Sequence, residues 1–190
     1  DVAQCHRELV IDAAQPVALL GIEPGRRVGQ QAQQRARLGR QQALQLAAVQ
    51  QRDDVHQQEH AIEVQLPFLQ LTLKEFLLLP LIVGDCPASS VAAVLEQQLD
   101  PQCLLLVSSD LSHYLNSRQA EQRDGATLQQ ILALQGELDG EQACGCHAIN
   151  GTLQWAARHG LQAQLLAYGH SGQISGDNQR VVGYGALALV

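Results

Sequence analysis

A polar segment at residues 108–114, Ser-Ser-Asp-Leu-Ser-His-Tyr, directly follows the apolar run at 103–107. In α/β folds, polar residues at the end of a buried strand emerge at the edge where functional groups gather. Asp110 and His113 are close enough along the chain for the carboxylate to orient the imidazole. Such a pair serves in acid/base catalysis, or as a metal ligand with its supporting group. The alternative is that Asp110 caps a turn and His113 is an ordinary surface residue.

A second candidate is Cys144, in the segment Ala-Cys-Gly-Cys-His at residues 143–147, where a helix is expected to begin. The free N–H groups and the dipole of a helix N-terminus favour the thiolate, the form that binds a metal or attacks an electrophile. The spacing of Cys144, Cys146 and His147 is not a standard zinc pattern, and one such cluster does not close a tetrahedral site. Since cysteine is also a common small buried residue, a structural role is the alternative.

A third candidate is the pair His56 and His60, one helical turn apart, with Glu59 between them. The arrangement matches the H-x-x-E-H pattern of inverted zinc peptidases, a pattern of low specificity. Residues 62–68 alternate as in a strand, but they also suit a helix with a kink at Pro67. The remaining histidines are expected to be surface or locally bonded residues: His6, His159 and His170.

The apolar pattern predicts an α/β fold, because continuous apolar runs alternate with segments of helical periodicity. The predicted strands are residues 16–21, 76–83, 103–107, 161–168 and 180–190, and the predicted helices are 41–50, 89–99, 117–134 and 144–159. This alternation implies a mostly parallel central sheet flanked by helices on both faces. Residues 172–177 are expected to form a loop in which Asp177 either caps a turn or reaches the same strand edge.

Composition limits the classes of function. The formal net charge of -7 argues against a nucleic-acid surface, which needs concentrated Lys and Arg. Five cysteines at irregular positions do not form a disulfide framework. No apolar run approaches the ~20 residues of a membrane-spanning helix. These features predict a cytoplasmic protein that binds neither nucleic acid nor membrane.

Five motifs, in one consistent order, carry a resemblance to a known family. Residues 59–70 resemble the segment EHSIEVQLPFLQ, and residues 80–84 the strand that follows it. Residues 108–114 match SSDLSHY, residues 143–145 match ACG, and residues 181–184 match a closing VVGY strand that Gly176 and Asp177 precede. The chain from about residue 55 onward therefore resembles the Memo-like family, known in bacterial gene sets as AmmeMemoRadiSam system protein B.

The resemblance implies a fold similar to the class III extradiol dioxygenases, with one metal pocket at the strand ends. Family members hold iron or copper through two N-terminal histidines and the cysteine that corresponds to Cys144. Asp110 and His113 would line the same pocket, and His60 lies in the first shared motif. A thiolate with imidazoles suits a redox-active metal better than magnesium or calcium. The family's gene-set name implies a role beside a radical-SAM protein.

The N-terminal part departs from the family pattern. The family's N-terminal PHAGY segment is absent, and residues 18–27 read Ala-Leu-Leu-Gly-Ile-Glu-Pro-Gly-Arg-Arg, without the expected second histidine. We therefore expect a Memo-like fold that is N-terminally truncated or degraded, with residues 1–54 as a remnant and 55–190 as the α/β domain. A missing element at the edge of a sheet favours self-association, so a homo-oligomer is expected.

Three functional hypotheses follow. The first is a Memo-like protein with a single iron or copper ion in a redox-type site, in which Asp110, His113 and Cys144 act and Cys144, His113 and His60 bind the metal. Its partner is an unknown small molecule or protein, and if it is an enzyme, it is a non-haem metal-dependent oxidoreductase. The second is a non-catalytic binding or scaffold protein that has lost the metal. The third is a zinc peptidase built on His56 and His60.

Overall fold

The computed structural model describes residues 9–11, 41, 43, 45–46, 49–52, 55, 59–73, 76–101 and 103–190. The chain divides into two compact units. The first unit comprises Asp1–Cys86 and Gln97–Cys103, and the second comprises Pro87–Glu96 and Leu104–Val190. No helix in these ranges is long and apolar enough to cross a membrane.

The first unit contains a small sheet of short strands. Strand β1 (Leu9–Ile11) lies between β2 (Val49–Gln51), with which it is parallel, and β3 (Leu81–Val83), with which it is antiparallel. Helix α2 (Leu66–Thr72) has Pro67 in its first turn, where a missing N–H costs nothing. Of the two alternatives for residues 62–68, the structure therefore has a helix, which begins at Leu66, one residue before the proline, after turns at 61–65.

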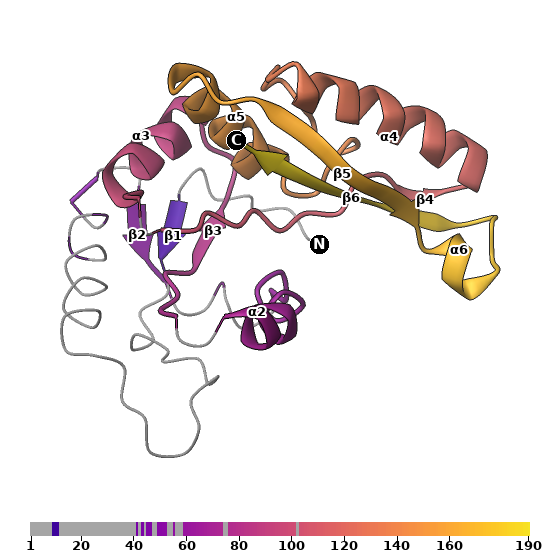
Figure 1. Ribbon diagram of the computed structural model, residues 1–190, viewed down its shortest axis with the longest axis horizontal. Coiled ribbons are helices and arrows are strands. Elements are labelled where there is room, and N and C mark those ends of the chain that lie inside the picture. Colours follow the sequence, from indigo (N-terminus) through magenta and orange to yellow (C-terminus); the bar gives the residue numbers. More distant parts are fainter. Residues whose placement is uncertain are drawn as a thin grey trace, which may run out of the picture. The chain divides into compact units, whose positions relative to one another are not determined.

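The second unit combines three main helices with a three-stranded sheet. The helices are α3 (Ala88–Gln98), α4 (Ser117–Leu132) and α5 (Cys146–Arg158), and a short helix α6 (Gly172–Ser175) follows strand β5. The sheet has the order β4-β6-β5, with β4 (His113–Leu115) and β5 (Ala163–His170) both antiparallel to β6 (Val181–Leu189). Helix α4 lies along this sheet (Figure 1).

Local sequence explains where these helices begin, end and bury a face. Asn116 caps α4, since its side-chain oxygen accepts the Gln119 N–H at 3.0 Å. Gly160, with φ at +68°, follows the end of α5, as expected for a C-terminal glycine. The buried core around α5 is a cluster of apolar side chains: Ile131, Leu138, Ala143, Cys146 and Leu153.

The predicted helices of the second unit are confirmed, with small shifts. The helix expected at 89–99 is α3, that expected at 117–134 is α4, and that expected at 144–159 is α5, which begins at Cys146. The predicted strands at 161–168 and 180–190 are confirmed as β5 and β6. The loop expected at 172–177 contains α6, which Gly176, with φ at +80°, caps at its C-terminal end.

The expected mostly parallel central sheet is wrong for the part of the chain that the structure describes. There, β1 and β2 form the one parallel pair, and the other pairs are antiparallel. The reason lies in the connection, because β5 and β6 are joined through the small α6 rather than through a long helical crossover. The broader prediction of a mixed α/β fold is confirmed, while the likeness to class III dioxygenases stays a prediction.

Two predicted strands are also corrected. Residues 103–107 have no regular secondary structure, because an apolar run forms a strand only where a neighbouring backbone pairs with it. Within residues 76–83 the strand is limited to β3, which starts directly after Pro80, a residue without an N–H donor. The helix expected at 41–50 is wrong at its C-terminal end, because residues 49–51 form strand β2. The strand expected at 16–21 lies outside the described residues, and the boundary expected at residue 55 stays a prediction.

Candidate metal site

Asp110, His113 and Cys144 come together in the second unit. One ligand atom from each, a carboxylate oxygen, an imidazole nitrogen and the sulfur, lies within 4.8 Å of the others. His113 Nε2 is 3.4 Å from Asp110 Oδ2, within ion-pairing distance. Cys144 is exposed and the other two side chains are half-buried, so the group is open to solvent. The three residues that sequence reasoning ranked highest thus form one chemical group.

The sulfur of Cys144 is held by the backbone of the neighbouring segment. The Asp110 N–H donates to Cys144 Sγ at 3.2 Å, and the Cys144 N–H donates to the Asp110 carbonyl at 3.3 Å. This reciprocal pair joins segments 34 residues apart in the chain. The position of the sulfur is therefore set together with the position of the Asp110 carboxylate.

Ser109 and Gly145 make the second link between these segments. The Gly145 N–H donates to Ser109 Oγ at 2.9 Å, and Ser109 Oγ lies 3.6 Å from Cys144 Sγ. A Cβ atom at position 145 would lie 2.9 Å from the Ser109 Cβ. Glycine is needed at this point because any larger residue would push the two segments apart.

A buried carboxylate positions the segment that carries Asp110 and His113. Asp124, on α4, is fully buried and accepts the Ser112 N–H at 2.9 Å and the Tyr168 hydroxyl at 2.8 Å. Burial raises the pKa of Tyr168, and its hydrogen bond to Asp124 raises that pKa further. Gly183 leaves the room that Asp124 needs, since a Cβ there would overlap the Asp124 carboxylate.

Sequence reasoning missed Asp124, although a signal was present. The buried face of α4 comprises Ala120, Asp124, Thr127, Leu128 and Ile131. These positions recur at helical spacing, so Asp124 is an acidic residue within the buried stripe. An acidic side chain inside such a stripe requires hydrogen-bond donors that are buried with it. Its presence in the sequence therefore indicates a buried hydrogen-bond network between α4 and the elements that pack on it.

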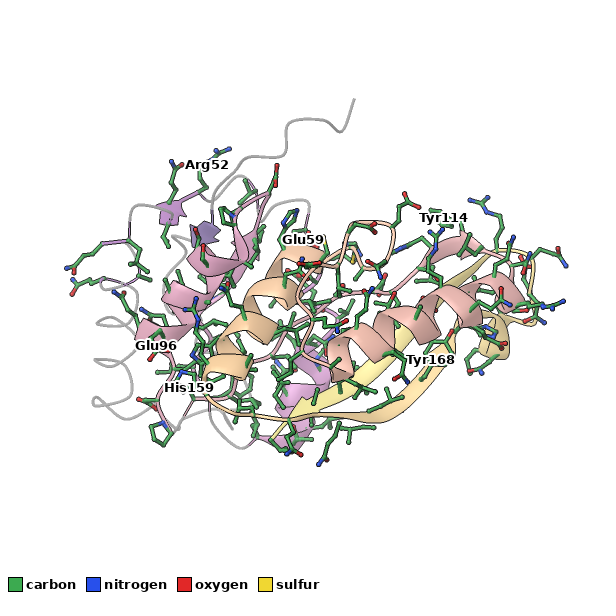
Figure 2. The ribbon with its side chains drawn as sticks, turned by 90° about the horizontal axis from the view of Figure 1, so that it is seen from above. Arg52, Glu59, Glu96, Tyr114, His159 and Tyr168 are labelled. Carbon is green, nitrogen blue, oxygen red and sulfur yellow. The ribbon has the colours of Figure 1, made fainter. Side chains whose placement is uncertain are left out.

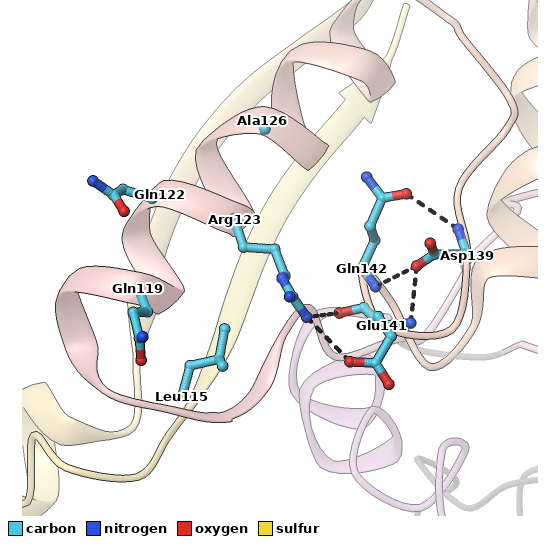
Figure 3. Close-up of a pocket in the computed structure, with 8 residues that line it drawn as sticks. All are labelled: Leu115, Gln119, Gln122, Arg123, Ala126, Asp139, Glu141 and Gln142. Atoms are coloured by element: carbon cyan, nitrogen blue, oxygen red, sulfur yellow. Dashed lines mark hydrogen bonds and ion pairs between the residues drawn. The ribbon is translucent and has the colours of Figure 1, made fainter.

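On the other side, a hydrogen-bonded turn presents Cys144. Asp139 Oδ1 accepts the N–H groups of Glu141 and Gln142, both at 3.0 Å. The Asn150 side chain, on α5, pairs with the backbone of Leu138, accepting its N–H at 2.9 Å and donating to its carbonyl at 2.8 Å. Figure 3 shows how the turn faces α4 across a surface pocket, with Arg123 3.1 Å from Glu141. The turn is thus tied to both helices.

The other cysteine and histidine candidates lie elsewhere. Cys146 is buried in the apolar cluster around α5, and burial raises the pKa of its thiol, so its role is structural. His147 is half-buried on α5 and is not part of the three-residue group. His60 belongs to the first unit, where its N–H donates to Glu59 Oε1 at 2.8 Å, and its role as a metal ligand stays a prediction. His56 and His6 lie outside the described residues.

Two further histidines have local partners. His159 Nε2 lies 2.7 Å from Glu96 Oε2, which pairs α5 with α3 (Figure 2), so the prediction of local bonding is confirmed. His170 is only 6% exposed and lies 3.6 Å from Glu121, so a surface position is wrong for it. It is buried because β5 packs against α4. Asp177 caps a turn by accepting the Gln179 N–H at 2.9 Å.

Comparison with known proteins agrees with the motif order. A family profile described as "Memo-like protein" matches residues 38–188. This chain belongs to the Memo-like family. Among its relatives, a MEMO1 family protein of Methanosarcina acetivorans is 34% identical over 149 residues, covering 70% of this chain and 56% of the relative. A MEMO1 family protein of Methanobrevibacter smithii is 35% identical over 143 residues, covering 68% and 51%.

A third relative, a MEMO1 family protein of Thermoplasma acidophilum, is 30% identical over 148 residues, covering 73% of this chain and 55% of the relative. The Memo-like chain thus spans about half the length of the curated relatives it matches. The matched range includes Asp110, His113 and Cys144. The prediction of the family is confirmed.

Proposed function

We propose that this Memo-like protein binds a single iron or copper ion through Cys144, His113 and Asp110 and uses it in redox-type chemistry. The observation that carries the proposal is the convergence of three different ligand atoms within 4.8 Å. His60 is proposed as a further ligand because it belongs to the first family motif. The proposal includes a small-molecule or protein partner, such as a radical-SAM protein, and a cytoplasmic location.

The donor set suits such an ion. Bonds of about 2.0–2.3 Å from a metal place its ligand atoms at most about 4.5 Å apart, so small side-chain rotations would close the group around one ion. A thiolate, an imidazole and a carboxylate together favour a transition metal over magnesium or calcium. Three protein ligands with solvent on one side leave an open position, as catalytic metal sites do.

The residues around the group have distinct tasks in this proposal. The Asp110 carboxylate orients the His113 imidazole, from which it is 3.4 Å away. The Asp110 N–H and the Ser109 hydroxyl hold Cys144 Sγ in place. Asp124 holds the Asp110–His113 segment in place by accepting the Ser112 N–H. A bound redox-active ion would supply an open coordination position and a change of oxidation state for a small-molecule ligand.

The free thiols support a reducing environment. Cys86, Cys103, Cys144 and Cys146 are all unpaired, and the structure describes these four of the five cysteines. A transition-metal thiolate site and free surface thiols both persist where thiols stay reduced. The cytoplasmic location is therefore part of the proposal, and so is self-association, which size-exclusion chromatography with light scattering tests directly.

Metal content is the decisive measurement. The protein is purified without a histidine tag, reconstituted anaerobically with ferrous or cuprous ion, and measured by inductively coupled plasma mass spectrometry. We expect close to one metal per chain in the native protein, with loss in Cys144→Ala and His113→Ala. Cys103→Ala is the matched control, because it removes another exposed thiol outside the group and should retain the metal.

Absence of metal above background after reconstitution would overturn the proposal and leave a non-catalytic binding or scaffold protein. The sequence feature that favours this second candidate is the lack of a histidine in residues 18–27. Metal that is lost in His56→Ala and kept in Cys144→Ala would instead indicate the H-x-x-E-H zinc site. Co-purification with a radical-SAM protein from the native cell tests the proposed partner separately.

A further inference from the structure

Tyr114 has a backbone conformation that bulky residues rarely adopt. Its φ is +60°, in the left-handed region, and Leu134 is the other non-glycine residue described with a positive φ. The cause is a β-bulge, because His113 pairs with Val182 and Leu115 with Val181, which leaves Tyr114 as the extra residue. Glycine would meet this backbone requirement without strain.

The Tyr114 side chain contributes little to the folded core. The residue is 66% exposed, and its ring stands at 61° to the His113 ring, with 5.7 Å between the centroids. A strained, exposed aromatic residue beside a candidate ligand is stabilised by neither backbone preference nor burial. Strained positions of this kind cluster at functional sites, so a use for the side chain outside folding is indicated.

Arg180 supplies a positive charge at the same place. Its Cζ lies 4.8 Å from the centroid of the Tyr114 ring. Within the described part of the chain, no carboxylate forms an ion pair with Arg180. A guanidinium that stacks on an aromatic ring keeps the N–H groups of its rim free, and the fork of these donors matches a carboxylate. The guanidinium thus lies against the ring of the residue that directly follows His113.

We propose that Tyr114 and Arg180 form an anion-binding edge of the Asp110–His113–Cys144 group, and that this edge takes a carboxylate-bearing ligand. Arg180 immediately precedes Val181 and Val182, the partners of Leu115 and His113, so the guanidinium is carried on the strand paired with the site. Tyr114 acts as the platform that orients it. The inference rests on the proposed function, because it assigns the ligand class of that same site.

Benzoate and benzamide form the matched pair of probes, since they share a ring and differ in charge. Each is titrated into the full chain without metal, and the His113 ring signals are followed by NMR. We expect saturable shifts with benzoate and none with benzamide. Benzoate affinity should fall by about threefold or more in Arg180→Gln and in Tyr114→Gly, a modest change because the pair is exposed. Arg118→Gln, another exposed arginine of the second unit, is the control and should leave the affinity unchanged.

Stability provides the second readout. Tyr114→Gly should keep the thermal midpoint within about 3 °C of the native value, because relief of the left-handed strain offsets the lost contacts. Equal binding of benzamide, or unchanged benzoate affinity in Arg180→Gln, would overturn the inference. A fall in the midpoint well beyond that range in Tyr114→Gly would show that Tyr114 serves the fold, and would overturn it too. Metal content is measured on the same samples, so failure of the metal proposal is seen separately from failure of the anion-binding edge.

Discussion

Asp110 lies on a segment without regular secondary structure that leads into the three-residue strand β4, whereas Cys144 lies two residues before the first residue of the 13-residue helix α5. Polar interactions hold the Asp110 side, through the buried Asp124 carboxylate and its two donors. The Cys144 side depends mainly on the apolar cluster around α5, to which the Asn150 amide ties the turn before Cys144. The two sides of one candidate site thus rest on different physical interactions.

The difference matters because hydrogen bonds are directional and apolar contacts are not. Removal of Asp124 would leave specific buried donors unpaired and free the segment to move. Removal of an apolar side chain leaves a cavity that its neighbours partly fill, while the backbone keeps its course. We therefore expect the loss of Asp124 to change the geometry of the Asp110 side, and the loss of an apolar side chain on the Cys144 side to lower stability alone.

The largest effect is expected for Asp124→Ala. The buried Ser112 N–H and the half-buried Tyr168 hydroxyl lose their partner, and together the two orphaned donors cost about 4 kcal/mol of unfolding free energy. Urea denaturation measures this loss, and the His113 NMR signals should shift as the segment moves. Glu137→Ala, on the surface, is the control. Unchanged His113 signals would contradict a positioning role for Asp124.

Leu153→Ala tests the apolar anchor. Leu153 is 2% exposed within the cluster, and its truncation should cost about 3 kcal/mol. The His113 signals should stay at their native positions, because no hydrogen bond of the site is lost. If they moved as far as in Asp124→Ala, the contrast between the two anchors would be wrong.

Asn150→Ala tests how much the Asn150 hydrogen bonds, as distinct from the apolar cluster, contribute to the position of Cys144. It breaks both hydrogen bonds to the Leu138 backbone and should cost about 2 kcal/mol, less than Leu153→Ala. Because the turn before Cys144 loosens, the thiol should react faster with a maleimide reagent. Native reaction kinetics would show that the cluster alone places the thiol.

Tyr168→Phe tests the Asp110 side of the site through the pH dependence of the free energy of unfolding. The pKa of Tyr168 is raised in the folded state, chiefly by burial, so its contribution to stability is present below its ordinary pKa of about 10 and is lost as pH rises above it. The variant should lose about 1 kcal/mol at neutral pH and should lack that part of the alkaline decline. Thermal unfolding between neutral and alkaline pH measures both, and parallel curves for the two proteins would refute this account.

The smallest effect is expected for Glu96→Gln, on α3, whose partner His159 lies at the end of α5 that is far from the site. The hydrogen bond with His159 lowers the pKa of Glu96, so the stability it contributes is present above the ordinary glutamate pKa of about 4.3 and is lost as pH falls below it. The variant should unfold with a slightly weaker acid dependence than the native protein. Both sides of the site should be unaffected, and any change in the His113 signals at neutral pH would argue against the separation proposed here.

The sequence alone determined the helices of the second unit, the family, and three residues that come together. Helix periodicity, the Asn116 cap and Gly160 are local signals. The family motifs identified Asp110, His113 and Cys144 as candidate site residues without any knowledge of contacts. Only the tertiary structure decided which strands pair and what holds the site. The antiparallel β4-β6-β5 sheet and the bond from the Asp110 N–H to Cys144 Sγ join segments distant in the chain. The burial of Asp124 likewise depends on where α4 packs, because strand pairing and burial are set by partners that no local pattern specifies.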